Sequence, residues 1–258
     1  MENTVLVEKF KKVRLIKLNR PESLNALNMQ MGDELVKAIA DAGGDPAVRA
    51  VIVTGSGRAF CSGGDLQFFS KWEGPKHEAF GVLTHRLHRI ILDIRQMPKP
   101  VIAAVNGTAS GAGFSLAMAC DLRIASDKAK FKQAYSSVGL VPDGGWTISL
   151  ARQIGMTKAA ELLLLDPVLK AEEVFNLGLL NEVVPEVELL NRAVKLADLV
   201  TSKSQTAFAK GKALLNRALF FDLAEQLELE RQGIMAAADE PDFAEGLAAY
   251  MEKRVPCF

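Results

Sequence analysis

The chain has 258 residues, of which 49% are hydrophobic, so it is long enough to bury a full core as one large domain or two small ones. Its 31 basic residues balance 31 acidic residues, which argues against a nucleic-acid-binding surface and an electrostatic membrane anchor. The N-terminal segment lacks the order of a signal peptide, and no apolar run approaches the roughly 18 residues of a membrane span. Cys61, Cys120 and Cys257 are too widely spaced for a disulfide framework. We therefore expect a soluble cytoplasmic protein with reduced thiols.

Short apolar segments alternate with helical patterns in the first part of the chain. Apolar side chains recur at helical spacing over 28–42 and 78–96, and the second pattern stops before Pro98. From about residue 144 onward the pattern is helical. Strands interleaved with helices, followed by helices, predict an α/β core over 1–195 and a helical region over 196–258. The predicted strands lie at 4–9, 13–18, 50–54, 101–105 and 121–126.

Two glycine-bearing segments follow buried apolar runs. AFCSGGDL (59–66) comes after AVIVTG, and NGTASGAGFSLAMACD (106–121) comes after VIAAV. Each is typical of a strand, a turn and a helix, where glycines let unpaired backbone N–H groups point at a ligand. Two such turns together are able to stabilise a carbonyl oxygen that gains negative charge. The alternative is that the glycines only allow tight packing of the turns.

Several other kinds of site fit the sequence poorly. Leu116 stands where the dinucleotide-binding fingerprint needs its third glycine, and no ribose-binding acid follows at the usual distance, so we do not expect NAD. No G-x-S-x-G motif is present to support a serine hydrolase. His85 and His88 lack an acidic ligand at matching spacing, and His77 lies in a polar stretch. We predict that these histidines are solvated and that the chain binds no metal.

Six segments along nearly the whole chain carry a resemblance to a known family. They are LNRPESLNALN (18–28), GRAFCSGGDL (57–66), KPVIAAVNGTASGAGFSLAMACDLRIAS (99–126), GLVPDGG (139–145), AEEVFNLGLLNEVVP (171–185) and YMEKRVPCF (250–258). In order and spacing the chain resembles the enoyl-CoA hydratase/isomerase (crotonase) superfamily. The resemblance implies a spiral of ββα units with a C-terminal helical region that serves as an oligomerisation surface or lid. It also implies an acyl-CoA substrate, no cofactor beyond the CoA moiety, and a homotrimer or dimer of trimers.

The resemblance further implies where the thioester oxygen is bound. Its two main-chain donors fall on Gly64 and on Ala112, where the family commonly has glycine. Because the backbone supplies the donor, Ala112 is able to serve. The two glutamates of the hydratase pattern are replaced by Ser115 and Tyr135.

Asp143 is the one carboxylate left at a family position used for catalysis. If it is catalytic, the simplest reaction is a shift of a carbon–carbon double bond, because a single acid suffices. The alternatives are hydration with Asp143 in place of the missing glutamates, a hydrolase or dehalogenase in which Asp143 is the nucleophile, and a non-catalytic acyl-CoA binder. Asp143 before GGWTIS is equally well placed as a helix N-cap.

Aromatic residues, together with the two replaced glutamate positions, predict a substrate pocket, and the resemblance implies a CoA site. Ser115, Tyr135, Phe68, Phe69 and Trp146 would line a pocket for a cyclic or bulky acyl group, although aromatic residues also simply fill cores. Asp65 is also a candidate N-cap, and Lys253 is a surface lysine by default. The residues that match CoA-binding positions are Ser23, Leu24, Ala26, Ser62, Asp65, Leu66, Tyr250 and Lys253.

Overall fold

A computed structural model describes residues 3–220 and 222–258. Within these residues the larger of two sheets has six strands in the order β1-β2-β3-β5-β7-β10, with β1 antiparallel to β2 and the rest parallel. Both faces of its central strands are buried, which explains why their sequences are continuous apolar runs. The strands are β1 (Val5–Phe10), β2 (Val13–Leu18), β3 (Ala50–Gly55), β5 (Val101–Val105), β7 (Leu122–Ser126) and β10 (Glu182–Val184).

After each of the strands β3, β5 and β7 of the larger sheet, the chain adds a short strand to a smaller, four-stranded sheet. Its order is β4 (Ala59–Cys61), β6 (Thr108–Ser110), β8 (Lys130–Lys132) and β9 (Leu169–Lys170). Thus β3 leads through β4 to α2 (Leu66–Lys71), β5 through β6 to α4 (Ala112–Ala119), and β7 through β8 to α5 (Trp146–Leu165). This repeat is the spiral of ββα units that the resemblance implied.

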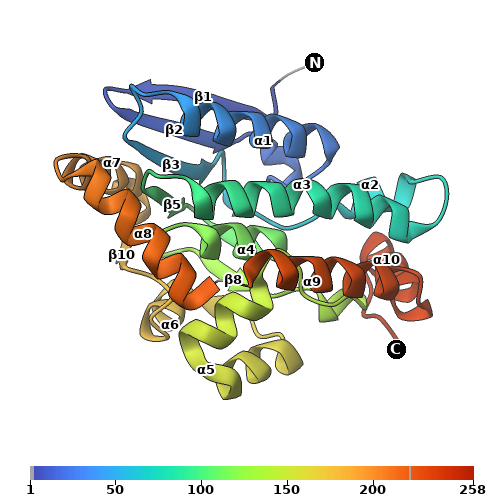
Figure 1. Cartoon of the computed structure of the whole chain (residues 1–258). Coiled ribbons are helices and arrows are strands. Elements are labelled where there is room, and N and C mark those ends of the chain that lie inside the picture. The colour runs from blue at the N-terminus through green and yellow to red at the C-terminus, as the bar shows by residue number, and fades with distance from the viewer. Residues whose placement is uncertain (1–2, 221) are drawn as a thin grey trace.

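Helices cover both faces of the larger sheet. On one face α1 (Met29–Gly44), α3 (Lys76–Gln96) and α4 contribute to the main apolar core. On the other face α7 (Leu189–Thr201) packs through Leu189, Ala193 and Ala197 against alternate residues of β2, β3 and β5. The remaining helices are α6 (Ala171–Asn176), α8 (Gln205–Phe220), α9 (Leu223–Ala238) and α10 (Pro241–Glu252). Figure 1 shows α9, in red, running beside α3, in green, and the two helices are in contact.

The predicted strands and helices of the core appear within one or two residues of their expected bounds. The strands of the smaller sheet were not predicted. The proposed boundary near residue 195 falls inside α7, which still packs on the larger sheet. The division of the chain into 1–195 and 196–258 therefore stays a prediction.

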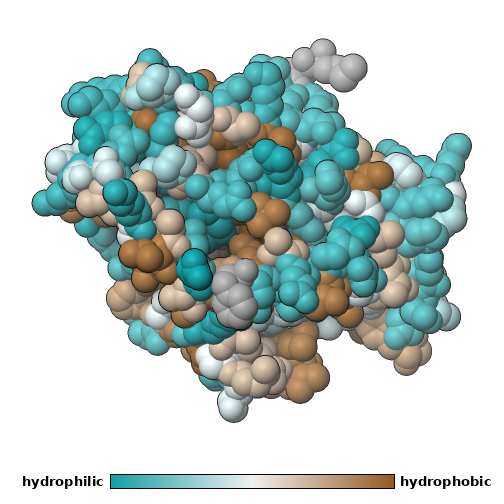
Figure 2. All heavy atoms as spheres, viewed as in Figure 1, coloured by the Kyte–Doolittle hydropathy of each residue, from teal (hydrophilic) through white to brown (hydrophobic). Residues whose placement is uncertain are grey.

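Exposed apolar side chains interrupt a largely hydrophilic surface. Figure 2 shows brown patches among the teal on one face of the molecule, and Leu164 and Leu215 are 78% and 64% exposed. None of the helices in the described part of the chain has both the length and the apolar composition needed to cross a bilayer. The three cysteines are unpaired. The predicted trimer or dimer of trimers stays a prediction.

Candidate active site

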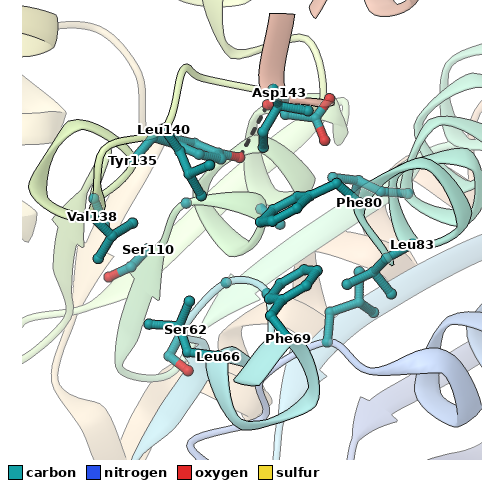
Figure 3. Close-up of a pocket in the computed structure, with 18 of the residues that line it drawn as sticks. Ser62, Leu66, Phe69, Phe80, Leu83, Ser110, Tyr135, Val138, Leu140 and Asp143 are labelled. Atoms are coloured by element: carbon teal, nitrogen blue, oxygen red, sulfur yellow. Dashed lines mark hydrogen bonds between the residues drawn. The ribbon is translucent and has the colours of Figure 1, made fainter. Parts of the chain in front are cut away.

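A cavity of about 290 Å³ opens where the two glycine turns meet α3 and α10. Gly63 and Gly64 of the first turn and Gly111 and Ala112 of the second lie in its wall. Figure 3 shows Asp143 and Tyr135 at one end, and Ser62, Leu66 and Phe69 toward the other. Most of the remaining wall is apolar and comes from Phe80, Leu83, Leu87, Val138, Leu140 and Ile234.

The residues on either side of Gly64 are both hydrogen-bonded to the main chain of Leu27. Leu27 N–H donates to Gly63 C=O at 2.7 Å, and Asp65 N–H donates to Leu27 C=O at 2.9 Å. These two bonds form a short parallel bridge between Leu27 and Gly64. They involve the carbonyl of Gly63 and the amide of Asp65, so the N–H of Gly64 stays free. Gly63 has φ of 105°, a left-handed conformation that favours glycine.

The amide of Ala112 opens helix α4, where the first N–H groups have no partner within the helix. Across residues 3–220 and 222–258, neither this amide nor that of Gly64 donates to a protein acceptor. The turns touch each other, since a Cβ on Gly113 would lie 2.0 Å from the carbonyl oxygen of Cys61. Two unused main-chain donors therefore line one cavity, which is the arrangement that binding a single carbonyl oxygen requires.

Side chains from α3, from α4 and from the loop at Tyr135 hold Asp143 at the end of this cavity. Asp143 is 2% exposed, and its Oδ1 accepts from Gly144 N–H at 2.6 Å and lies 2.5 Å from His88 Nε2. Its main-chain carbonyl accepts from Ser115 Oγ at 2.7 Å and from Tyr135 Oη at 3.2 Å, the contact drawn in Figure 3. No hydrogen bond joins Oδ2 to any residue that the structure describes.

The prediction that His88 is solvated is wrong. His88 is 8% exposed and contacts Asp143 from α3, whereas His85 is exposed and His77 pairs with Asp239 at the surface. His88 lies four residues after the buried Thr84 and three before the buried Ile91, so helical spacing places it on the buried face. That spacing was the available signal, but its partner is 55 residues away in sequence.

The N-cap alternative for Asp143 is also wrong. Helix α5 begins at Trp146 with Gly145 as its N-cap residue, and Asp143 makes no capping bond. Glu230 of α9 instead accepts from Gly145 N–H at 2.6 Å and from Thr147 N–H at 3.1 Å. Burial, reinforced by the nearby charge of Asp143, raises the pKa of Glu230 to about 7.

Only part of the predicted acyl pocket lines the cavity. Tyr135 and Phe69 do so, and burial raises the pKa of Tyr135 well above its usual value of 10, so its hydroxyl stays protonated. Among the residues that the structure describes in the cavity wall, Ser115, Trp146 and Phe68 are missing. Ser115 turns its hydroxyl to the Asp143 carbonyl, Trp146 is 1% exposed in the core, and Phe68 packs edge-on against Phe69 and Trp72.

The segments predicted to bind CoA come together at the mouth of the cavity. Ser62 N–H donates to Leu24 C=O at 3.1 Å, and Leu24 has a left-handed φ of 51°. Ser62 Oγ reaches Ser23 C=O at 3.5 Å, while Arg20 donates to Ala26 C=O at 2.5 Å. The two serines, Leu24 and Ala26 therefore form one small surface beside the first glycine turn.

The other predicted CoA residues flank this surface. Asp65 is the N-cap of α2, as the alternative anticipated, because Oδ1 accepts from the N–H groups of Gln67 and Phe68, and Oδ2 pairs with Arg20 at 2.7 Å. Leu66 and Tyr250 line the cavity. Lys253 is exposed just beyond, at the C-cap of α10. Contact with CoA stays a prediction for all of them.

Comparisons with known proteins agree with this architecture. The family model for enoyl-CoA hydratase/isomerase matches residues 8–258. A crotonyl-CoA hydratase of Syntrophomonas wolfei is 38% identical over 97% of this chain and 95% of its own. A 1,2-epoxyphenylacetyl-CoA isomerase of Escherichia coli is 35% identical over 100% and 99%. The crystal structure of an enoyl-CoA hydratase from Mycobacterium avium subsp. paratuberculosis K-10 superposes with a TM-score of 0.90 at 32% identity, covering 99% of this chain and 98% of that one.

Relatives of both reaction types thus match along the whole chain, and the family match includes both glycine turns and the segment that carries Asp143. The chain belongs to the enoyl-CoA hydratase/isomerase (crotonase) superfamily.

Proposed function

We propose that the protein isomerises an unsaturated acyl-CoA, with Asp143 moving a proton so that a carbon–carbon double bond shifts. One observation supports this most directly. Among the described residues that line the cavity, Asp143 supplies the only carboxylate, and the unused amides of Gly64 and Ala112 lie in the same wall.

The proposed reaction passes through an enolate. The amides of Gly64 and Ala112 donate to the thioester oxygen as it becomes negative, and each such donor contributes about 3 kcal/mol to stabilising the transition state. Asp143 Oδ2, which has no described hydrogen bond, removes a proton from one carbon and returns it to another. His88 and Gly144 N–H keep Oδ1 in place meanwhile. A single carboxylate completes this cycle because the proton removed is also the proton returned.

Hydration is supported less well by the same residues. Adding water requires one group to activate it and another to protonate the neighbouring carbon. Ser115 and Tyr135, at the positions of the two usual glutamates, donate to the main-chain carbonyl of Asp143 and carry no carboxylate. Of the three proteins compared above, two are named hydratases and one an isomerase, so the names lend no support to isomerisation over hydration.

The experiment uses 2-enoyl-CoA and 3-enoyl-CoA thioesters in deuterated water. We expect a shifted double bond and no mass gain of one water, with deuterium entering the product to the extent that protonated Asp143 exchanges with solvent before it returns the proton. Asp143→Asn should lower the rate by roughly 10²- to 10⁴-fold, while Asp41→Asn, an exposed aspartate on α1, should not. A hydroxyacyl product from the 2-enoyl substrate, or full activity in Asp143→Asn, would reject the proposal.

The contact between His88 and Asp143 favours a second candidate, in which Asp143 is a nucleophile. A nucleophile within hydrogen-bonding reach of a base is the usual signature of covalent catalysis. Asp143 would attack an acyl-group carbon and expel a halide, or attack the thioester carbon and expel CoA. Water activated by His88 would then cleave the resulting ester or anhydride at the aspartyl carbonyl. Single turnover in ¹⁸O-labelled water would leave label in Asp143, and an unlabelled aspartate would remove this candidate.

The apolar wall favours a bulky or cyclic acyl group. Phe69 and Phe80 are stacked, with ring centroids 3.9 Å apart and planes within 7°. Thr84 also lines the cavity, but its hydroxyl donates to Phe80 C=O at 2.7 Å. A panel of linear, branched and ring-containing thioesters tests this preference, and a lower kcat/KM for rings than for short linear chains would contradict it.

A further inference from the structure

Glu230 is a buried carboxylate outside the cavity wall. It lies on α9, is 5% exposed, and forms no ion pair with a residue in the described part of the chain. Its Oε2 accepts from Gly145 N–H, and its Oε1 accepts from both the N–H and the hydroxyl of Thr147. Gln226, one turn earlier on α9, donates to the same Thr147 hydroxyl at 2.9 Å. Two side chains of α9 therefore hold the start of α5.

These hydrogen bonds take the place of an N-cap side chain, which α5 does not have next to its own N-terminus. No side chain next to its N-terminus accepts from its first amides, and Gly145 stands at the N-cap position. Gly145 is buried and Thr147 is half-buried, and the partner of both amides is a distant carboxylate. Negative charge at a helix N-terminus is also favourable for the helix dipole.

The segment that Glu230 holds also carries Asp143, the proposed base. Asp143, Gly144 and Gly145 are consecutive, and both glycines have left-handed φ angles of 69° and 78°. A Cβ on Gly144 would lie 2.9 Å from Leu87 and from Ser115, so the turn is wedged between α3 and α4. His88 and Ser115 hold the turn from these helices, and Glu230 holds its other end from α9.

We propose that Glu230 is a positioning residue, which acts from the C-terminal region through Gly145 and Thr147 to keep Asp143 aimed into the cavity. The proposal rests on Asp143 carrying the reaction, as proposed above, and holds whether Asp143 acts as a base or as a nucleophile. Without Glu230, the turn loses its hydrogen bonds at Gly145 and Thr147, while His88 still contacts Asp143 at the other end. A displacement of about 1 Å in a reacting group costs up to roughly 10²-fold in rate.

The test compares Glu230→Gln and Glu230→Ala with Glu225→Gln, an exposed glutamate on the same helix. Glutamine keeps one acceptor oxygen but presents an NH₂ group to the other donor, so we expect kcat to fall about 10-fold. Alanine has neither acceptor oxygen, so for Glu230→Ala we expect kcat to fall about 100-fold. KM and the Kd for a saturated acyl-CoA should stay within about twofold, because the residues that line the cavity are unchanged. Glu225→Gln should match the parent chain.

A double-mutant cycle separates positioning from general structural support. In the Asp143→Asn background, Glu230→Gln should have no further effect on kcat, because the group it positions is already lost. Independent, additive losses would overturn the proposal, as would a Glu230→Gln protein with unchanged kcat. Thr147→Val, which removes only the hydroxyl donor, provides a milder perturbation if Glu230→Ala does not fold. Full activity in Asp143→Asn would instead reject the proposed function itself.

Discussion

Replacing Ala112 with proline removes one main-chain donor while leaving its helix intact. Ala112 is the first residue of α4, the position at which proline is best tolerated, and its N–H has no protein partner to lose. Gly111 before it has φ of 50° and ψ of −123°, the mirror image of the extended region, so the pre-proline restriction is met. Losing one oxyanion donor should lower kcat/KM roughly 10²- to 10³-fold, about 3 kcal/mol of transition-state stabilisation.

The assay is steady-state kinetics on an enoyl-CoA thioester, with circular dichroism and thermal melting to establish folding. Ala112→Gly keeps the N–H and is the matched control, for which we expect kcat/KM within about threefold of the parent chain. Because the proline ring fills space next to the cavity, binding of a saturated acyl-CoA is measured as well. If Ala112→Pro folds, binds the saturated thioester and turns over at the parent rate, residue 112 contributes no donor and the reasoning is refuted.

Three further predictions concern the supports of the site. Gly113→Ala places a Cβ 2.0 Å from the Cys61 carbonyl oxygen and should destabilise the fold by about 3 kcal/mol or more, seen as a lower midpoint in urea unfolding; an unchanged midpoint would contradict this close contact. The pKa of Glu230 is raised in the folded protein to about 7 from 4.5, so the folded state binds the proton more tightly and stability falls as pH rises between these values. Between about pH 5 and about pH 8 this group should cost about 2–3 kcal/mol in the free energy of unfolding, and parallel pH profiles of the parent and Glu230→Gln would argue against it. Arg20→Leu removes the ion-pair partner of Asp65 at the predicted CoA surface and should raise KM for acyl-CoA about 10-fold with kcat unchanged. An unaltered KM in steady-state kinetics would mean that this ion pair does not contribute to substrate binding.

The large sheet was predictable because its strands are buried on both faces. Runs such as VIAAV contain no polar interruption, and each ends at a glycine or a turn that marks the boundary. The strands of the smaller sheet were not predictable in this way. They are two or three residues long, as in Ala59–Cys61, which is too short for alternation to be recognised. The two glycine turns were located from sequence, while the contact between them is a product of the folded sheets.

The acid–base part of the site was only partly predictable. Asp143 was identified from its family position, but its partners come from other helices and are 55 and 28 residues away in sequence for His88 and Ser115. Trp146 was expected in the cavity because its aromatic ring suits a cyclic or bulky acyl group. It lies in the core instead, since it begins α5 and turns toward the packed side of that helix. The capping carboxylate of Glu230 had no local signal, because caps are normally supplied by the residue next to the helix.

The wall of the cavity is assembled from nearly the full length of the chain, from Leu27 to Tyr250. Contacts between such distant segments require large loops to close, which slows folding. Until α9 docks, the apolar surface around Phe80 and Leu87 on α3 stays open to water. A chain in which α9 is not docked would therefore expose the same apolar side chains of α3 that line the cavity, and exposed apolar surface favours aggregation.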